Sequence, residues 1–379
     1  MLIQGMGTTD TLANVHQESL ASFAGEMNAT NDRQRRLIKR LYEQTTIENR
    51  GSVLINSSDP EMEEISAASK LSGFRSFYAS TAKNGKMNNP TTCERMAMYE
   101  RKALPLAVDA TRQALIEAGM TAEMVTHVVI VTCTGFASPG LDIRLIHELG
   151  MKVTTERTAI GFMGCHGAVN GLRTARAITQ ADPSQIVLVC CVELCTLHYQ
   201  YGWDEQAIVA NSLFSDGAAA AVVTGDIEVN STCPDKTTNL PNIMSFKTTV
   251  MPDSENAMTW RMGANGFLMT LSPTVPNLVK DNLFEFIKPW LLKHGLMTDD
   301  IQGWAIHPGG PRIIRAVEKA LSLPDHSGDI SRNILKKYGN ISSPTLLFIL
   351  KKLINVKRPR PWVALAFGPG LVIEAALIT

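Results

Sequence analysis

The sequence has no excess of either charge. Its 379 residues include 36 lysines and arginines and 36 aspartates and glutamates, so the formal net charge at pH 7 is zero. Proteins that bind nucleic acid or anionic membranes through charge carry a basic excess. We therefore expect no nucleic-acid partner and no polybasic membrane anchor.

The sequence also lacks long apolar runs. No segment reaches the roughly 20 consecutive apolar residues that a membrane-spanning helix needs. Residues 1–17 show neither the basic region nor the apolar region of a secretory signal peptide. These two absences predict a cytoplasmic protein with no stable insertion into a membrane.

Cysteine is present, but without the spacing of a disulfide framework or a metal site. The count is seven, at positions 93, 133, 165, 190, 191, 195 and 233. An odd count in a long chain of cytoplasmic type argues against a set of disulfides. Cys191 and Cys195 have no second pair of ligands nearby, so we expect no metal. Most of the thiols are expected to be small buried groups.

What the chain does have is an alternation of apolar and amphipathic segments. Continuous apolar runs predict buried strands at 126–135, 154–162, 184–193, 302–310 and 361–378, the last being two strands joined by a glycine turn. Amphipathic periodicity predicts helices at 16–45, 101–119, 138–150, 169–181, 272–295, 311–321 and 342–355. Such alternation predicts an α/β protein with mostly parallel, mixed sheets covered by helices.

The second half of the chain echoes the first. The strand and helix that begin at 126 correspond to those that begin at 302, and the strand at 184–193 corresponds to the one that follows residue 360. Residues 229–243 are polar and contain two prolines, as a connection does. We therefore predict two related halves, residues 1–230 and 231–379.

One cysteine lies at a glycine-rich corner between a predicted strand and a predicted helix. This is Cys165, in the stretch GFMGCHGA. A helix N-terminus favours a thiolate over a thiol, and glycines leave room for a substrate to approach. A thiolate attacks thioesters and amides. A buried core cysteine is the competing interpretation, and the glycine corner favours the nucleophile.

A nucleophilic cysteine needs polar partners. His307 follows a predicted buried strand in WAIHPGGP, where Gly309 and Gly310 leave space beside it. Asn340, in YGNISSPT, precedes a helix, where an ordinary turn or N-cap residue is the alternative interpretation. His166 neighbours Cys165 but is expected to point elsewhere, because adjacent residues on a helix face different directions.

Cysteine, histidine and asparagine in this order also occur in papain-like proteases. That interpretation fits poorly, since no tryptophan follows Cys165, the cysteine is far from the N-terminus, and the strand–helix alternation differs.

Seven segments resemble one family over nearly the whole chain. They are VTCTGFASPG, GFMGCHGAVNGLR, SLFSDGAAA, WRMGANGF, WAIHPGGP, YGNISSPT and FGPGL. In this order they resemble the type III polyketide synthases, the chalcone synthase-like enzymes, of a bacterial type. The resemblance implies a thiolase-like αβαβα five-layered fold, a homodimer, and a catalytic set of Cys165, His307 and Asn340.

The resemblance also implies a reaction. Cys165 takes an acyl group from a coenzyme A thioester, malonyl-CoA loses carbon dioxide, and the resulting enolate lengthens the acyl chain. The enolate oxyanion suits donors such as an imidazole N–H and the Asn340 amide, whereas an aspartate could not donate. The substrates are acyl-CoA and malonyl-CoA, and the chemistry needs no metal or redox cofactor.

Further residues are assigned by their matching motifs. Phe214 and Phe267 match two gatekeeping phenylalanines, although each is equally a core aromatic by its sequence alone. Ser138 lies in a loop that reaches the partner subunit in relatives, through a peptide that is expected to be cis. The resemblance assigns contacts with coenzyme A to Arg36, Lys39 and Arg40, for which a solvated basic helix face is the alternative, and to Gly309 and Gly310.

The expected substrate cavity departs from the plant pattern. The residues that the resemblance places around the substrate are Cys133, Thr134, Cys195, Met258 and Ser342, and His198 stands where plant enzymes have a threonine. These differences favour a fatty acyl starter and an alkylpyrone or alkylresorcinol product. The alternatives are a ketosynthase III-like enzyme that performs one condensation and a non-catalytic protein that binds acyl-CoA.

Overall fold

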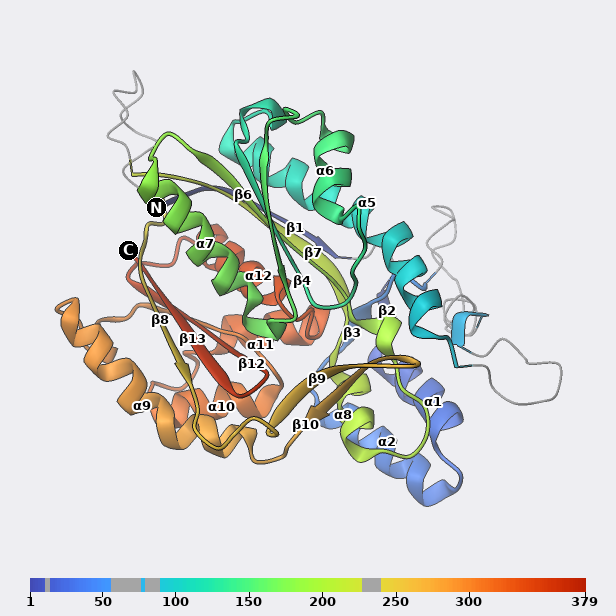
Figure 1. The fold of residues 1–379 in the computed structure, drawn as a ribbon. Helices are drawn as coiled ribbons and strands as arrows, with labels where there is room; N and C mark the ends of the chain where they lie inside the picture. The colour runs from blue at the N-terminus through green and yellow to red at the C-terminus, as the bar shows by residue number, and fades with distance from the viewer. Residues whose placement is uncertain (11–13, 56–75, 79–88, 227–239) are drawn as a thin grey trace.

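Two β-sheets form the framework of the computed structural model, which describes residues 1–10, 14–55, 76–78, 89–226 and 240–379 (Figure 1). The larger sheet has the strand order β1-β7-β6-β4-β5 and the smaller one β11-β12-β13-β8. The strands of the larger sheet are β1 (Leu2–Asp10), β4 (His127–Thr132), β5 (Glu156–Gly161), β6 (Ile186–Leu194) and β7 (Asp216–Thr224). Those of the smaller sheet are β8 (Ile243–Val250), β11 (Gly303–Ile306), β12 (Trp362–Gly368) and β13 (Val372–Ile378).

Both sheets are mixed, as predicted, but parallel pairing is less frequent than the alternation suggested. Strand β4 is parallel to β5 and β6, and β11 is parallel to β12. The pairs β1–β7, β6–β7, β12–β13 and β13–β8 are antiparallel. The turn between β12 and β13 is short, and strands joined by a short turn can only pair antiparallel.

The predicted echo between the two halves is visible in the sheets. The strands β11-β12-β13-β8 repeat the order and the directions of β4-β6-β7-β1, and β5 has no counterpart in the smaller sheet. The correspondences predicted for β4 with β11 and for β6 with β12 are therefore confirmed. The predicted boundary near residue 230 lies outside the described residues.

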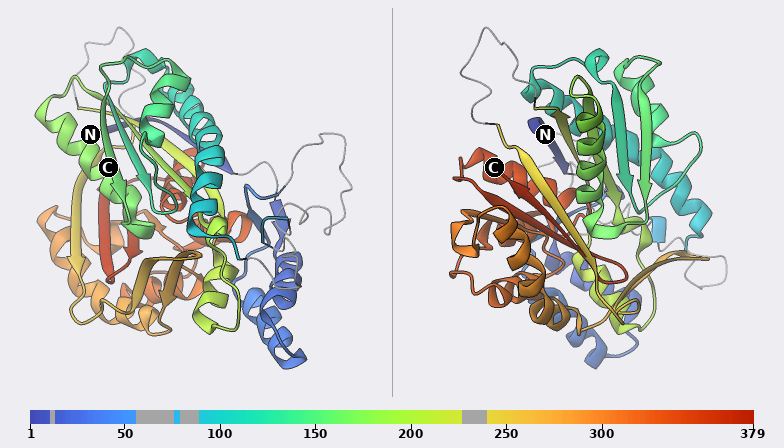
Figure 2. Two further views of the ribbon diagram at one scale, coloured as in Figure 1. Left: turned by 45° about the vertical axis from the view of Figure 1, so that its right-hand side comes forward. Right: turned by 60° about the vertical axis from the view of Figure 1, so that its left-hand side comes forward.

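Helices alternate with the sheets to give five layers (Figures 1 and 2). Helices α5 (Thr92–Ala118) and α6 (Leu141–Leu149) cover the outer face of the larger sheet, and α9 (Val275–Lys293) and α10 (Pro311–Ala320) cover the outer face of the smaller one. Helices α7 (Gly167–Ala181) and α12 (Pro344–Asn355) pack between the two sheets. The predicted αβαβα arrangement is confirmed.

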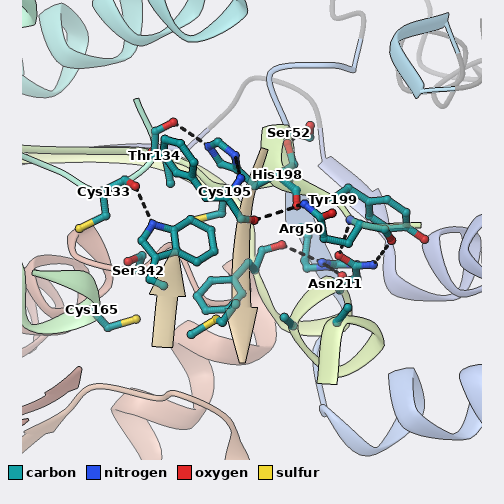
Figure 3. Close-up of a pocket in the computed structure, with 18 of the residues that line it drawn as sticks. Arg50, Ser52, Cys133, Thr134, Cys165, Cys195, His198, Tyr199, Asn211 and Ser342 are labelled. Carbon is teal, nitrogen blue, oxygen red and sulfur yellow. Dashed lines mark hydrogen bonds between the residues drawn. The ribbon is translucent and has the colours of Figure 1, made fainter. Parts of the chain in front are cut away.

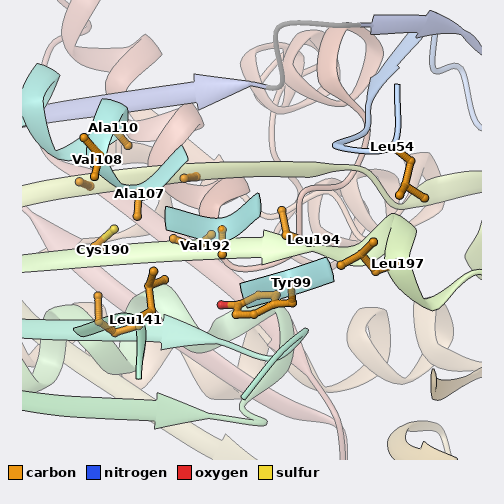
Figure 4. Packing of buried hydrophobic residues seen from close by; sticks show 14 of the residues in the cluster. Leu54, Tyr99, Ala107, Val108, Ala110, Leu141, Cys190, Val192, Leu194 and Leu197 are labelled. Carbon is orange, nitrogen blue, oxygen red and sulfur yellow. The ribbon is translucent and has the colours of Figure 1, made fainter. Parts of the chain in front are cut away.

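The central strands are apolar throughout because both of their faces are buried. In β6, Cys190 and Val192 face the outer core with α5 (Figure 4), as does Leu188, while Val187 and Val189 face α7 and α12. This alternation follows from the two-residue period of a strand. Two covered faces explain why the strand reads as a continuous apolar run.

Helix α5 begins earlier than periodicity predicted, at Thr92 rather than near residue 101. Thr91 and Glu94 form a capping box, in which each side chain accepts from the other residue's backbone amide. The predicted end is confirmed: Gly119 adopts φ 66°, the left-handed conformation that glycine tolerates.

The remaining elements lie on the edges of this core. Helices α1 (Gln17–Asn28) and α2 (Asp32–Gln44) account for the predicted helical region 16–45. Other strands and α-helices of the described residues are β2 (Asn14–His16), β3 (Asn49–Gly51), α8 (Glu205–Leu213), α11 (Asp329–Tyr338) and the hairpin of β9 (Met258–Gly263) and β10 (Gly266–Leu271). In the described part of the chain, no helix combines the length and apolar character that crossing a membrane requires.

Candidate active site

Cys165 occupies the predicted corner between a strand and a helix. Strand β5 ends at Gly161, Cys165 lies in the 3-10 turn Gly164–His166, and α7 starts at Gly167. Gly164 adopts φ 71°, and a Cβ atom there would come within 2.4 Å of Pro369 Cδ. Glycine is therefore required at the turn, which brings the buried Cys165 side chain to the edge of a cavity (Figure 3).

Burial disfavours the thiolate form of Cys165. Burial raises its pKa to about 11, and the nearby Glu193 carboxylate adds to this rise. Hydrogen bonds with the side chains of Ser342 and Asn340 act in the opposite direction. In this balance burial outweighs the preference for a thiolate that the helix N-terminus was expected to provide.

His307 lies directly after β11, and its backbone amide donates to Leu365 O of β12 over 2.8 Å. Its side chain is fully enclosed, and both ring nitrogens lack a hydrogen-bond partner among the described residues. Burial, with a smaller effect of the nearby His166, lowers the pKa of His307 to about 3. The structure therefore favours a neutral imidazole with two unpaired nitrogens, close to the cavity but not among the residues that line it.

Asn340 is fixed through its backbone and its side chain. Its amide donates to Leu213 O over 2.9 Å, and its carbonyl accepts from the Ser215 amide over 2.9 Å. Its side-chain Oδ1 accepts from the Ser342 amide over 2.8 Å. This bond uses the oxygen and leaves the Nδ2 donor for Cys165, whose pKa the Asn340 side chain lowers.

The fold thus brings the three predicted catalytic residues into one region. Asn340 is close enough to Cys165 to lower its pKa, and β12, which accepts the hydrogen bond of the His307 amide, packs against the turn that carries Cys165. His166 does not line the cavity: its Nδ1 is 2.7 Å from Asn170 Oδ1.

The cavity next to Cys165 is lined by residues from both halves of the chain. The cavity left between the lining side chains is small, with a volume of about 70 Å³. Seven of the predicted substrate contacts line it: Cys133, Thr134, Cys195, Phe214, Met258, Phe267 and Ser342. In Figure 3, Cys165 lies on one side of the lining, and Arg50 and Tyr199 lie on the opposite side. The cavity therefore reaches from the thiol toward helices α1 and α2.

Ser138 is not brought into this cavity. The Ser138–Pro139 peptide is cis, as predicted, and the side chain of Ser138 is exposed. It borders a separate hollow that Tyr99 and Phe136 also line.

The residues predicted to contact coenzyme A also lie outside the cavity lining. Arg36, Lys39 and Arg40 are exposed on α2. Gly309 and Gly310 follow His307, and a Cβ atom at Gly309 would meet only Ile313 Cγ1, at 3.4 Å. A Cβ atom at Gly310 would meet only Leu213, at 3.8 Å, so both glycines have few neighbours within van der Waals distance.

Sequence patterns did not single out the buried carboxylate of Glu193. Its oxygens accept from the Cys133 amide over 2.9 Å, from Thr134 Oγ1 over 2.8 Å and from Ser343 Oγ over 2.6 Å. Burial raises its pKa to about 7. The sequence feature that could have identified it is an acidic residue near the end of an otherwise apolar strand. A buried acidic side chain is rare unless hydrogen-bonding partners surround it.

Metal ligands are absent from the part of the chain that the structure describes: it contains no group of three or more His, Cys, Asp or Glu side chains placed to hold an ion.

Two family models match the chain. The model of chalcone and stilbene synthases, N-terminal domain, matches residues 77–227, and that of the C-terminal domain matches residues 242–379. The crystal structure of PKS-I from the brown alga Ectocarpus siliculosus superposes with a TM-score of 0.87 at 29% identity, covering 100% of this chain and 97% of that one.

Two curated relatives are similar along much of their length. The α-pyrone synthesis polyketide synthase-like Pks18 of Mycobacterium tuberculosis is 30% identical over 380 residues, which cover 99% of this chain and 90% of that protein. The 1,3,6,8-tetrahydroxynaphthalene synthase of Streptomyces peucetius is 36% identical over 278 residues, 73% of this chain and 72% of that protein.

Fold and relatives together define a type III polyketide synthase, an acyltransferase that builds polyketide chains. The chain belongs to the chalcone and stilbene synthase family.

Proposed function

We propose that this synthase loads a fatty acyl group from coenzyme A onto Cys165 and extends it with malonyl-CoA. The lengthened chain then cyclises to an alkylpyrone or an alkylresorcinol. The observation that carries the proposal is the position of the Cys165 thiol at the edge of a largely apolar cavity, where the side chains of Ser342 and Asn340 lower its pKa.

Loading begins from neutral groups. As the Cys165 sulfur attacks the thioester carbonyl, a free ring nitrogen of His307 accepts the thiol proton. The bond between the carbonyl carbon and the coenzyme A sulfur breaks, and the departing thiolate takes that proton from His307. A buried imidazole with a depressed pKa releases the proton readily, so His307 returns to its neutral form.

Extension follows at the same place. Malonyl-CoA releases carbon dioxide, and the electron pair of the broken bond forms an enolate. An N–H of neutral His307 and Nδ2–H of Asn340 donate to the enolate oxygen. The enolate carbon attacks the acyl carbonyl on Cys165, a carbon–carbon bond forms, and the sulfur leaves as a thiolate. That thiolate takes the lengthened chain back, and the released coenzyme A thiolate is protonated by solvent.

The lining of the cavity favours a long aliphatic starter. Leu20 and Phe23 of α1 contribute apolar surface to the cavity lining, and so does Ile55. Burying each methylene of an acyl chain on such surface stabilises binding by about 0.8 kcal/mol. The name of the mycobacterial relative, which refers to α-pyrone synthesis, is consistent with this class of product.

The basic face of α2 is proposed to meet the phosphates of coenzyme A. Arg36, Lys39 and Arg40 are exposed there, and no ion pair of theirs occurs among the described residues. Gly309 and Gly310 are proposed to give the pantetheine arm room beside His307. Because contacts between exposed charges are screened, raising the salt concentration should raise KM for acyl-CoA.

The enzyme is proposed to act as a homodimer that pairs through β5. This strand forms one edge of the larger sheet, and five of its six residues are exposed. The neighbouring Phe136 is 40% exposed beside the cis Ser138–Pro139 peptide. A free strand edge next to exposed apolar surface suits a symmetric partner.

Product analysis tests the proposed function. The purified protein is incubated with malonyl-CoA and acyl-CoA starters of increasing length, and products are identified by mass spectrometry beside the Cys165→Ala variant. We expect cyclic triketides or tetraketides from long starters, absent in the variant. Linear products of a single extension would instead indicate a ketosynthase III-like enzyme. Failure to form any carbon–carbon bond, with acyl-CoA still bound, would overturn the proposal.

A further inference from the structure

The hairpin β9–β10 forms one wall of the cavity. Direct pairing of Trp260 with Met269 places these two side chains on one face of the hairpin, and both line the cavity together with Phe267. Arg261 and Leu268, which pair with each other, are exposed on the opposite face. The shape of the cavity therefore depends on where this hairpin is held.

His198 ties the hairpin to the rest of the cavity. Its Nε2 is 2.8 Å from Thr134 O, and its Nδ1 is 3.0 Å from the backbone nitrogen of Phe267. A carbonyl can only accept and a backbone amide can only donate, so the proton must be on Nε2. Burial lowers the pKa of His198 to about 3, so the neutral ring keeps both bonds at neutral pH.

The ring of Phe267 is also enclosed by aromatic contacts. It stacks on His198 with centroids 4.2 Å apart and planes 10° apart. Trp260 meets it edge-on at 5.7 Å, and Phe162 lies at 5.4 Å. The indole N–H of Trp260 donates to Cys133 O over 2.8 Å, a second link between the hairpin and the residues after β4. Such contacts favour one ring position.

Phe214, the other residue of the predicted gate, has a different environment. It is half-buried, and its neighbours in the small cluster around Leu213 and Leu335 are aliphatic. Where the structure describes the chain, no aromatic ring stacks on it or meets its edge. The two predicted gate residues are thus held very differently.

We propose that His198 is a positioning residue that fixes hairpin β9–β10 and the ring of Phe267 as a rigid cavity wall, which leaves Phe214 as the movable residue of the gate. The statements about the gate and about product length rest on the proposed function. The attachment of the hairpin itself can be measured without any activity.

Hydrogen exchange of the full-length protein, without substrate, tests the attachment. The variant His198→Thr removes the ring and both of its bonds, and His198→Gln offers one donor and one acceptor in their place. The matched control is His147→Thr, at an exposed position on α6. We expect exchange in residues 258–271 to rise about tenfold in His198→Thr, with partial rescue in His198→Gln and no change in the control. Unchanged exchange at 258–271 in a folded His198→Thr variant would overturn the proposal.

Product profiles test the consequence for the reaction. His198→Thr and Phe267→Ala should both shift the distribution of product lengths, because both release the same wall. Phe214→Ala should change KM for acyl-CoA while it leaves that distribution unaltered. If Phe214→Ala and Phe267→Ala shift the product distribution equally, the assignment of one fixed and one movable residue is wrong. If no variant and no wild type forms products, the proposed function fails, while the exchange result still decides whether His198 holds the hairpin.

Discussion

The side-chain oxygen of Asn340 accepts a hydrogen bond of 2.8 Å from the backbone amide of Ser342. Ser342 adopts φ 61°, a left-handed conformation that is rare for residues other than glycine. The bond determines which end of the Asn340 amide faces Cys165. A strained residue two positions further along the chain thus orients a donor at the site.

Replacing Asn340 by aspartate should therefore remove catalysis without unfolding the protein. The carboxylate can still accept from the Ser342 amide, but it has no N–H to offer and brings a negative charge to the developing oxyanion. We expect the rate of product formation to fall about 100-fold or more, measured as kcat with saturating malonyl-CoA. Asn355→Asp, at an exposed end of α12, is the matched control. Normal turnover by a folded Asn340→Asp variant would contradict the role of the amide.

The neutral state of Cys165 predicts a steep pH dependence of its alkylation. Below a pKa of about 11, the thiolate fraction of Cys165 rises about tenfold for each pH unit. Modification by iodoacetamide, followed on the peptide that contains Cys165, should therefore accelerate about 100-fold between pH 7 and pH 9. A rate that stays flat over this range would show a thiolate already formed in the free enzyme.

Glu193 predicts a pH-dependent contribution to stability. Its pKa of about 7 in the folded protein lies above the ordinary value of 4.5, so the folded state retains a proton that the unfolded state releases. The stability from this group is present below pH 4.5 and is lost as the pH rises through 7. Glu193→Gln stays neutral and does not lose this stability as the pH rises. The unfolding free energy of the variant minus that of the wild type should therefore increase by about 1–3 kcal/mol between pH 5 and pH 8.

Chemical denaturation at the two pH values measures this difference. Glu148→Gln, at an exposed position on α6, serves as the control and should show no such increase. An equal stability difference for Glu193→Gln at pH 5 and pH 8 would mean that Glu193 does not titrate in this range.

Met258 is expected to limit the length of the starter. Its side chain is buried and lines the cavity, so Met258→Ala opens space there. When acyl-CoA starters compete, kcat/KM for the longest chain relative to the shorter ones should rise about 3- to 10-fold. A change of this size is expected when the cavity accepts one or two more methylenes of the acyl chain. The control is Met262→Ala on the same hairpin, where the side chain is 65% exposed. An unchanged chain-length profile in Met258→Ala would place the limit elsewhere.

Much of the layered fold could be predicted because its signals are local. Strands such as β4 and β6 are buried on both faces, and the helices between them have clear periods and glycine ends such as Gly119. Strand β1 and the hairpin β9–β10 were missed. Strand β1 contains Gly5 and Gly7, whose missing Cβ atoms allow close contact with α5, and its partner β7 is some 200 residues away. Neither feature appears in a local pattern.

Sequence motifs pointed to the residues of the proposed site, whereas its electrostatics could not be predicted from them. The glycine corner and the motifs indicated Cys165, His307 and Asn340, and the structure brings them to one region. The protonation of Cys165 depends on total burial, which only the assembled fold supplies. The same holds for His198, whose two hydrogen-bond partners, Thr134 and Phe267, are 64 and 69 residues away in the chain.

The central claim is that Cys165 carries the acyl chain, and acylation mapped by mass spectrometry tests it most directly. The protein is incubated with one long-chain acyl-CoA in the absence of malonyl-CoA, then digested and sequenced. We predict one acyl group, on the peptide that contains Cys165, and none on the Cys165→Ala variant. An acyl group that remains on Cys133 or Cys195 in that variant, or an unmodified wild type, would contradict the account.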